Sequence, residues 1–441
     1  MAESDQRRAV QPTRGGRHVA SGRSNGPSPR TGRGRHSRTK AQVYRRRRIL
    51  AACAAVFLAF FIWLAISLGG ALMNPSLGAT PMSRFAEWGR GHGIGFAVTW
   101  IEQEWYKLNP PKVGGKPPSG ALKPKVKGGK AAATSSTCPS ALPEPTTVVS
   151  PAQPAQPGEG QWQAAGRLSA SCPSIYVTYV RPDAIHTSYV VGIAWMDPKL
   201  LSATLYSGSQ IPGGGPFTNT APISATAAQT LTSAFNAGFR MGDSQGGYFT
   251  DGKTIVPLVN GAASAVIYKD GAMKIGVWGR DYSMGPNVVS VRQNLRLIVD
   301  GGAAVPGLNS NDNSQWGATL GGDAYVWRSG IGQTANGALV YVGGPGLSIT
   351  DLADLLVRAG AVRGMELDIN TDWVNYSYYA PPVGQPASPS NGSELLSTMT
   401  GGADRYFASY WARDFFTMSA RFPANGTETP STTHTTTTRH R

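Results

Sequence analysis

The sequence predicts an α+β protein, in which a strand-rich mixed domain with few helices is preceded by one transmembrane helix. Three observations support this fold class. Short runs rich in Val, Ile, Tyr and Trp recur between residues 161 and 423, with Gly, Asn and Asp between them. Helical periodicity is clear only in Thr226–Ala234 and Ser348–Arg358. The apolar run Ile49–Met73 is much longer than either.

The positive charge of the chain is concentrated at its start. Residues 1–48 hold 14 Arg or Lys against Glu3 and Asp5, whereas residues 131–441 hold 18 basic and 20 acidic residues. We expect residues 1–48 to form a disordered basic cytoplasmic tail, because they are too poor in apolar residues to build a core. Anionic lipid is a sufficient partner for such a tail, so we expect no specific nucleic acid.

The second segment, residues 49–73, is predicted to be a transmembrane helix. It runs for 25 residues without a charge, and about 20 suffice to cross a bilayer. Arg45–Arg48 abut its N-terminal end, which predicts a cytoplasmic N-terminus and an extracytoplasmic C-terminal domain on a single-pass membrane protein. A cleaved signal peptide is the alternative, although its apolar region is normally shorter.

Three further segments flank the domain. Residues 74–108 form an aromatic juxtamembrane segment with partly helical spacing, which would lie on the membrane surface or pack on the domain. Residues 109–160 are rich in Pro, Gly, Lys and Ala and predict an extended linker. Residues 424–441 predict a disordered Thr-rich tail.

Residues 161–423 suit one large domain. Ser348 or Thr350 would begin the better of the two predicted helices and Gly360 would end it. With the flanking apolar segments this helix makes one strand-helix-strand unit within a largely β framework. The expected strands are Ile175–Val180, Ser188–Trp195, Ala265–Tyr268, Lys274–Trp278, Leu295–Val299, Ala324–Trp327, Ala338–Val342 and Gly364–Ile369.

Cysteine and histidine limit the chemistry. Cys138 and Cys172 lie on the predicted extracytoplasmic side, where a disulfide between them is the favoured interpretation and a reactive thiol the alternative. His186 is the one histidine of residues 161–423, which argues against a His-rich metal site and a Ser-His-Asp hydrolase. A packed structural role suits His186 better. The cofactor is unknown; a divalent cation on aspartate oxygens stays open, although no spacing matches a defined loop.

The segment Gly364–Trp373 carries the strongest local pattern. On a strand, alternation places Glu366, Asp368 and Asn370 on one face. Two carboxylates on one face can have their pKa values pushed apart, so that one acts as acid and the other as base, as glycoside cleavage requires. A half-exposed edge strand with a solvated polar face explains the same pattern equally well.

Other polar residues follow apolar runs and stand next to glycine. Asn236, Asp300 and Arg328 are the three examples, and a glycine-flanked strand end lets a ligand approach the backbone closely. The planar guanidinium of Arg328 suits a phosphate or a carboxylate. Ordinary hairpin turns produce the same pattern.

The order of these segments resembles the phosphodiester glycosidase family over about residues 170–420. The segments are Asn236–Phe239, Arg292–Leu295 before Asp300–Gly302, Arg328–Gly332, Leu339–Val342, Gly346–Ala353 and Leu367–Asp368. The resemblance implies Asn236, Arg328 and Asp368 as site positions. The chain departs from the family where Ile369–Asp372 replaces a glycine-rich loop, as in a divergent, membrane-anchored, actinobacterial-type member, and amides that reach a phosphate there would be blocked.

Two functions follow. The first is an extracytoplasmic hydrolase of a sugar-phosphodiester linkage in an envelope glycan or phosphopolymer, with Asp368 or Glu366 as acid or base. Arg328, Asn236, Asn370 and Asp300 would bind substrate. The second is a non-catalytic module of the cell envelope that binds or assembles polysaccharide with the same cleft. The lipid bilayer is the other expected partner.

Overall fold

A computed structural model describes residues 39–123, 141–308, 316, 325–408 and 411–421. The chain forms two compact units, Met1–Trp63 and Leu64–Arg441. We describe each unit by itself.

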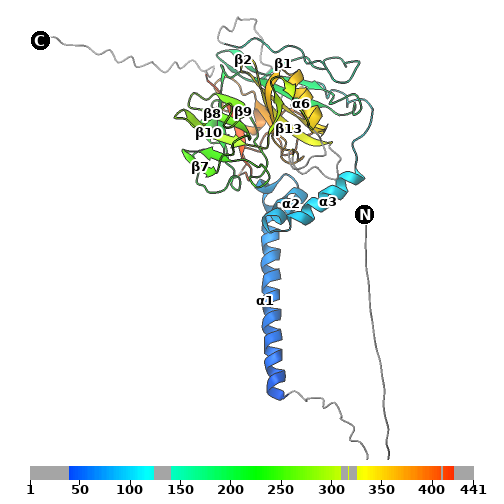
Figure 1. Cartoon of the computed structure of the whole chain (residues 1–441), viewed down its shortest axis with the longest axis vertical. Helices are drawn as coiled ribbons and strands as arrows, with labels where there is room; N and C mark the ends of the chain where they lie inside the picture. Colours follow the sequence, from blue (N-terminus) through cyan, green and yellow to red (C-terminus); the bar gives the residue numbers. More distant parts are fainter. Residues whose placement is uncertain (1–38, 124–140, 309–315, 317–324, 409–410, 422–441) are drawn as a thin grey trace, which may run out of the picture. The chain divides into compact units, whose positions relative to one another are not determined.

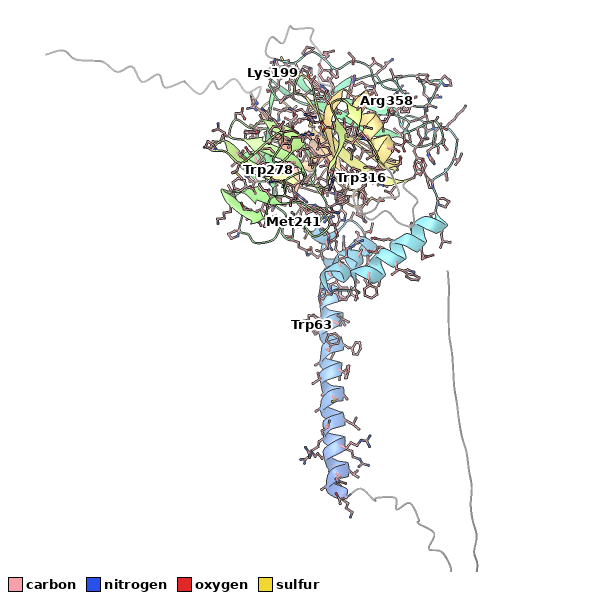
Figure 2. All side chains as sticks on the ribbon, in the orientation of Figure 1. Trp63, Lys199, Met241, Trp278, Trp316 and Arg358 are labelled. Carbon is pink, nitrogen blue, oxygen red and sulfur yellow. The ribbon has the colours of Figure 1, made fainter. Side chains whose placement is uncertain are left out.

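Helix α1 (Lys40–Met73) begins in the first unit and ends in the second. Within the described residues, α1 is the helix that is long and apolar enough to cross a membrane. Its large side chains are exposed: Phe57 is 65% exposed and Trp63 is 54% exposed. Figure 2 shows Trp63 projecting from the helix surface. Apolar side chains exposed all round a helix are expected where lipid, not protein, surrounds it.

The second unit is built from three sheets whose paired strands are all antiparallel. In the described residues helices are few, which confirms the predicted strand-rich α+β class. Figure 1 shows β13 of one sheet and β8 and β10 of another gathered with helix α6 in one globular body. The main core lies between the sheets and includes Phe235, Tyr341 and Met365.

The first sheet has eight strands in the order β1 (Gln163–Ser169), β2 (Cys172–Val180), β3 (Val191–Met196), β14 (Leu339–Leu347), β13 (Val326–Thr334), β15 (Ala361–Glu366), β11 (Leu297–Asp300) and β12 (Ala303–Ala304). The second has the order β7 (Lys253–Val256), β6 (Tyr248–Thr250), β10 (Val288–Gln293), β8 (Ala263–Tyr268) and β9 (Met273–Val277). The third has the order β17 (Gly392–Glu394), β16 (Tyr376–Tyr379), β5 (Leu231–Asn236), β18 (Phe415–Ala420) and β4 (Leu201–Tyr206).

The predicted strand-helix-strand unit is present as β14, α6 (Ile349–Arg358) and β15. Strand β13 lies between β14 and β15 and is antiparallel to both, so β14 and β15 are parallel to each other. Ser348 begins α6 as predicted: its hydroxyl accepts the amide of Asp351, and the Asp351 carboxylate accepts the Ser348 amide. Apolar residues of α6 pack against the sheet.

The predicted helix Thr226–Ala234 differs in the structure. Only α4 (Ala225–Ala228) is helical there, and β5 begins at Leu231. Every residue of β5 is buried between its neighbours β16 and β18. A strand buried on both faces shows no alternation of apolar and polar residues, which is why the sequence resembles a buried helix.

Residues 141–160, expected to be part of an extended linker, pack on the first sheet. Val148 and Ala152 are 1% exposed, and the backbone amide of Gly160 donates to the carbonyl of Tyr179. Glu159 forms a buried ion pair with Arg181. The globular body therefore includes residues that precede Gln161.

Residues 74–108 are helical, as their spacing suggests. They form a short 3₁₀ turn (Pro75–Leu77), α2 (Pro81–Gly91) and α3 (Gly95–Leu108). The end of α1 packs on α2 through Leu68, Ala71 and Trp88, and the Trp88 indole donates to Ser67. The second 3₁₀ turn of the described chain is Pro389–Asn391.

Candidate active site

Strand ends from the first and third sheets meet at one cavity. Strand β15 ends at Glu366, β5 ends at Asn236, and Arg413 lies two residues before the start of β18. The cavity has a volume of about 1010 Å³. Its lining comes partly from α2 and α3, partly from the turn after β5, and partly from Asp368, Asn370, Trp373 and Arg413.

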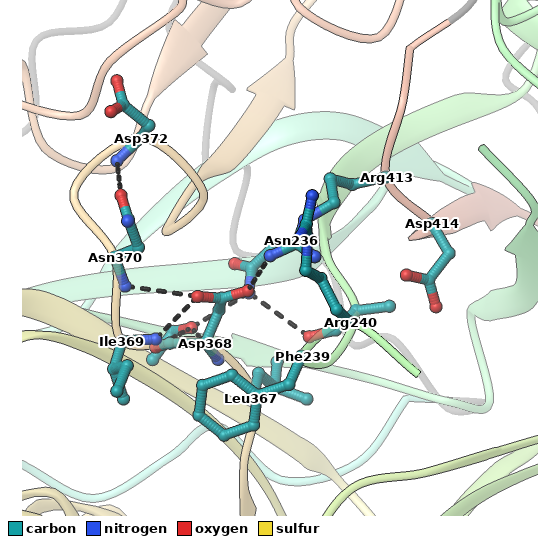
Figure 3. A network of polar contacts seen from close by, with 12 residues as sticks. Asn236, Phe239, Arg240, Leu367, Asp368, Ile369, Asn370, Asp372, Arg413 and Asp414 are labelled. Carbon is teal, nitrogen blue, oxygen red and sulfur yellow. Dashed lines mark hydrogen bonds and ion pairs between the residues drawn. The ribbon is translucent and has the colours of Figure 1, made fainter. Parts of the chain in front are cut away.

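Asp368 and Asn370 are the predicted site residues that line this cavity. Asp368 is the candidate for the reactive group. It is 2% exposed, and one carboxylate oxygen accepts the amides of Ile369 and Asn370 at 2.8 and 3.2 Å. The other oxygen pairs with Arg413 at 3.1 Å. Figure 3 shows Asp368 at the centre of this network. Every described partner of the carboxylate is a donor, so the arrangement favours its ionised form.

Burial of the Asp368 carboxyl group acts in the opposite direction and favours its neutral form. Removal of Asp368 from water raises its pKa to about 6, and the charge of Arg413 and the two amide hydrogen bonds oppose the rise. Nearby Glu87 adds to the rise by repulsion. A carboxyl group with a pKa near neutrality can change protonation during a reaction, and such groups are concentrated at functional sites.

Glu366 lies behind the cavity lining and is fully buried. One of its oxygens pairs with Arg328, which is also fully buried, and the other has no hydrogen-bond partner. Burial raises the pKa of Glu366 to about 7, while Arg328 lowers it and Asp368 raises it further. Strand β15 is internal to its sheet, so the alternative of a solvated edge strand does not hold.

Arg328 is therefore an internal partner and not a lining residue. Its guanidinium donates to Glu366 and to the carbonyl of Leu347 at 3.0 Å. The structure places it on β13, in a sheet position that the cavity does not reach. A direct contact between Arg328 and a ligand in the cavity is not supported.

Asn236 also contacts protein groups. Its amide nitrogen donates to the hydroxyl of Ser329 at 3.0 Å, and its oxygen accepts Tyr341 and the amide of Asn375. Ser329 in turn donates its backbone amide to the carbonyl of Asp368 at 2.8 Å. Asn236 thus holds the Asp368 segment in place through Ser329.

The amide side chain of Asn294 also holds the segment around Asp368 in place. Asn294 donates to the carbonyls of Glu366 and Leu367 at 2.9 and 3.1 Å, and its oxygen accepts the amide of Phe239. A Cβ atom on Gly238 would come within 2.9 Å of the Asn294 oxygen. The Asn236–Phe239 turn therefore needs glycine for this close approach.

Arg413 supplies free donors to the cavity. Its Nε and Nη1 atoms are buried and have no hydrogen-bond partner, although the residue is only 7% exposed. Its guanidinium stacks 4.7 Å above the ring of Trp373. Arg240, after the β5 turn, also lines the cavity, pairs with Glu87 of α2 and has an unpartnered Nε. Unpaired guanidinium donors at a cavity wall are suited to an anion.

The loop that replaces the glycine-rich segment turns its amides inward. The Ile369 and Asn370 amides bind Asp368, and the Asp372 amide binds the Asn370 side chain at 2.8 Å. These amides are therefore not free to bind a phosphate, as the bulkier sequence implied. Asn370 lines the cavity.

The remaining predicted residues lie elsewhere. Asp300 forms ion pairs with Arg280 and Arg363 and does not line the cavity. Cys172 is disulfide-bonded, but Cys138 lies outside the described residues, so their pairing stays a prediction. His186 is buried and bonds to Asp183 at 2.8 Å. No group of three potential metal-ligating side chains occurs among the residues described.

Sequence reasoning missed Arg413, Arg240 and Glu87. Arg413 carries a related signal, because the strand-forming run Phe415–Ala420 begins two residues after it. Arg240 follows the Asn236–Phe239 turn by one position. Glu87 lies in α2 and is brought to the cavity by tertiary packing alone.

Comparison with known proteins identifies the family of the central segment. Residues 224–368 match the phosphodiester glycosidase family, and this segment ends at Asp368. One similar solved structure is the zebrafish N-acetylglucosamine-1-phosphodiester alpha-N-acetylglucosaminidase catalytic domain, auto-inhibited by its pro-peptide. It is 16% identical over 59% of this chain and 88% of its own, with a TM-score of 0.37. A hypothetical protein from Synechocystis is 13% identical over 57% and 63%, with a TM-score of 0.29. No curated protein matches.

Proposed function

We propose that this chain, whose residues 224–368 belong to the phosphodiester glycosidase family, is a hydrolase of a phosphodiester-linked sugar in the cell envelope. One observation carries the proposal. Asp368, with a raised pKa, and Arg413, with unpartnered donors, face the same cavity and contact each other. The first can move a proton, and the second can hold a phosphate.

The proposed reaction uses the ionised form of Asp368. Its carboxylate takes a proton from water while the water oxygen forms a bond to C1 of the sugar. The bond from C1 to the phosphate oxygen breaks, and its electron pair leaves with the phosphate. Arg413 stabilises the phosphate anion, which needs no proton in order to leave. Glu366 stays paired with Arg328 and takes no part in the proton transfer.

The membrane location is part of the proposal. Arg45–Arg48 stand at the N-terminal side of the apolar stretch of α1, so the positive-inside bias orients residues 1–48 to the cytoplasm. The cavity-bearing body then lies outside the membrane, where envelope glycans and phosphopolymers are found. Signal-peptide cleavage remains the alternative that intact-mass analysis of the membrane fraction would detect.

A second candidate is a non-catalytic envelope module. The inward-turned amides of Ile369 and Asn370 favour it, because a ligand phosphate would lose the donors that a glycine-rich loop supplies. The cavity and Arg413 would still bind an anionic glycan.

The deciding experiment is hydrolysis of a panel of chromogenic sugar-1-phosphodiesters by the full chain in lipid nanodiscs. Cleavage at C1 releases the free sugar and the phosphate monoester of the chromophore, which a coupled phosphatase converts into the coloured product. Release of both products that depends on Asp368 supports the hydrolase. Tight retention of envelope phosphopolymer without turnover of any member of the panel would support the non-catalytic module.

The pH dependence should identify the reactive form of Asp368. Burial raises the pKa of this carboxyl to about 6, so its ionised fraction rises through that pH. We expect kcat/KM to rise between pH 5 and 7 and then to level off. A profile that falls through the same range would instead make protonated Asp368 the acid.

Replacement of Arg413 should separate binding from chemistry. We expect Arg413→Ala to raise KM for a phosphodiester by about 10- to 100-fold, since charge-assisted hydrogen bonds are lost. It should also move the midpoint of the pH profile upwards, because Arg413 lowers the pKa of Asp368. Arg413→Lys keeps the charge and should preserve the midpoint better than KM. An unchanged KM in Arg413→Ala would remove the phosphate-binding role.

A further inference from the structure

The cavity has two chemically different walls. One wall carries Asp368, Arg413 and Arg240, which suit a sugar and its phosphate. A second part of the lining comes from α2 and α3 and includes the apolar side chains of Phe85, Val98, Ile101 and Trp105, beside the Arg90–Glu102 ion pair. A sugar phosphate alone gives no reason for an apolar wall, because polar groups lose hydration when they are placed against one.

Helix α3 exposes apolar side chains both at the cavity and outside it. Ile101 and Trp105 line the cavity and are nevertheless 45% and 65% exposed, so they form its rim. Beyond them, Phe96 and Trp100 are 77% and 62% exposed and are not part of the lining. Helical spacing places Phe96 and Trp100 on a different face of α3 from Ile101 and Trp105. Exposed apolar side chains with tryptophan among them are typical of the membrane interface.

The position of this wall in the chain links it to lipid. Helix α2 packs directly on the last turns of α1, and α1 is the described helix that is apolar enough to cross a bilayer. The Glu87 ion pair with Arg240 fixes α2 to the turn beside Asp368. The apolar part of the lining therefore belongs to helices that follow α1 directly in the chain, the first of which packs on the end of α1.

We propose that the cavity binds a lipid-linked phosphosugar, in which the sugar and phosphate lie on Asp368 and Arg413 and the alkyl or isoprenoid chain of the aglycone lies on Ile101 and Trp105. This inference rests on the proposed function, for which it names the substrate class. A soluble wall polymer is the competing ligand, and it would have no use for the apolar rim.

The test measures binding and turnover separately, with the full chain in nanodiscs and empty nanodiscs subtracted. The probes are non-hydrolysable sugar-1-phosphonate esters of butanol and octanol, together with the matching hydrolysable phosphates. Each buried methylene is worth up to about fourfold in affinity, so we expect the octyl ester to bind at least about tenfold more tightly than the butyl ester. Equal dissociation constants would overturn the inference.

A pair of matched variants locates the chain of the lipid. Ile101→Ser with Trp105→Ser should reduce the octyl preference to less than about threefold, because the rim loses its apolar surface. Phe96→Ser with Trp100→Ser removes comparable exposed surface from the same helix outside the cavity and should keep the preference. An octyl preference that survives in the Ile101 and Trp105 variant would overturn the inference. A preference for octyl phosphonate without hydrolysis of any phosphate would support the ligand and reject the hydrolase.

Discussion

Asp368→Asn is expected to lower kcat by about 10²- to 10⁴-fold while the protein stays folded. The amide side chain keeps the size of the carboxyl and an oxygen for the Ile369 and Asn370 amides, but it cannot take a proton. Steady-state kinetics on the best phosphodiester of the panel, together with thermal unfolding, would measure both effects.

Asp300→Asn is the matched control for this prediction. Asp300 is also a strand-end aspartate that contacts arginines, yet it lies outside the cavity lining and is 29% exposed. Loss of its partly exposed ion pairs should cost at most about 1 kcal/mol and leave kcat within about twofold. Full activity in Asp368→Asn, or equal loss in both variants, would show that Asp368 is not the reactive group.

Arg328→Met is expected to destabilise the fold rather than weaken substrate binding. Glu366 would then remain fully buried without its cation, and the loss of one partner of a buried pair costs about 3–5 kcal/mol. The pKa of Glu366 in the folded state, already raised from 4.5 to about 7, would rise further. Protonation relieves the buried charge, so the loss should be small at pH 5 and grow as the pH rises to 8.

The double variant Arg328→Met with Glu366→Gln tests this explanation, because it removes the buried charge together with its partner. We expect it to recover most of the stability lost at pH 8 and to remove the pH dependence of that loss. The measurement is urea unfolding of the full chain, monitored by tryptophan fluorescence at pH 5 and at pH 8. A stable Arg328→Met protein with a raised KM would return Arg328 to the ligand-binding role implied by resemblance.

The fold class was predictable because it depends on local sequence patterns. Strand β2 and helix α6 show their character in composition, and the Ser348 cap marks where α6 begins. Strand β5 was misjudged because a doubly buried strand has no polar period for the sequence to display. The packing of residues 141–160 was also invisible, since Pro and Gly composition reports on backbone conformation and not on what the segment contacts.

Part of the candidate site was predictable from the sequence, and there is a physical reason why the rest was not. Glu366 ends strand β15 and Asp368 follows it by two residues, so their spacing in the sequence already places them close together. The different roles of the two carboxylates were not predictable, because they depend on the arginine with which each one pairs. Asp368 pairs with Arg413, which precedes β18, and Glu366 pairs with Arg328 of β13. Motif order also placed Asn236 at the site, but only its hydrogen bonds show that it acts through Ser329.

The strand order of the third sheet sets a requirement on biosynthesis. Strand β18 follows every other described strand in the chain, yet it sits between β5 and β4 and brings Arg413 with it. During synthesis, β5 and β4 each keep one edge unpaired until this segment emerges, and exposed strand edges favour aggregation. A product interrupted before residue 413 would therefore lack both an anion-binding cavity and a closed sheet, so nascent chains should be inert and dependent on chaperones until nearly the whole body has been delivered.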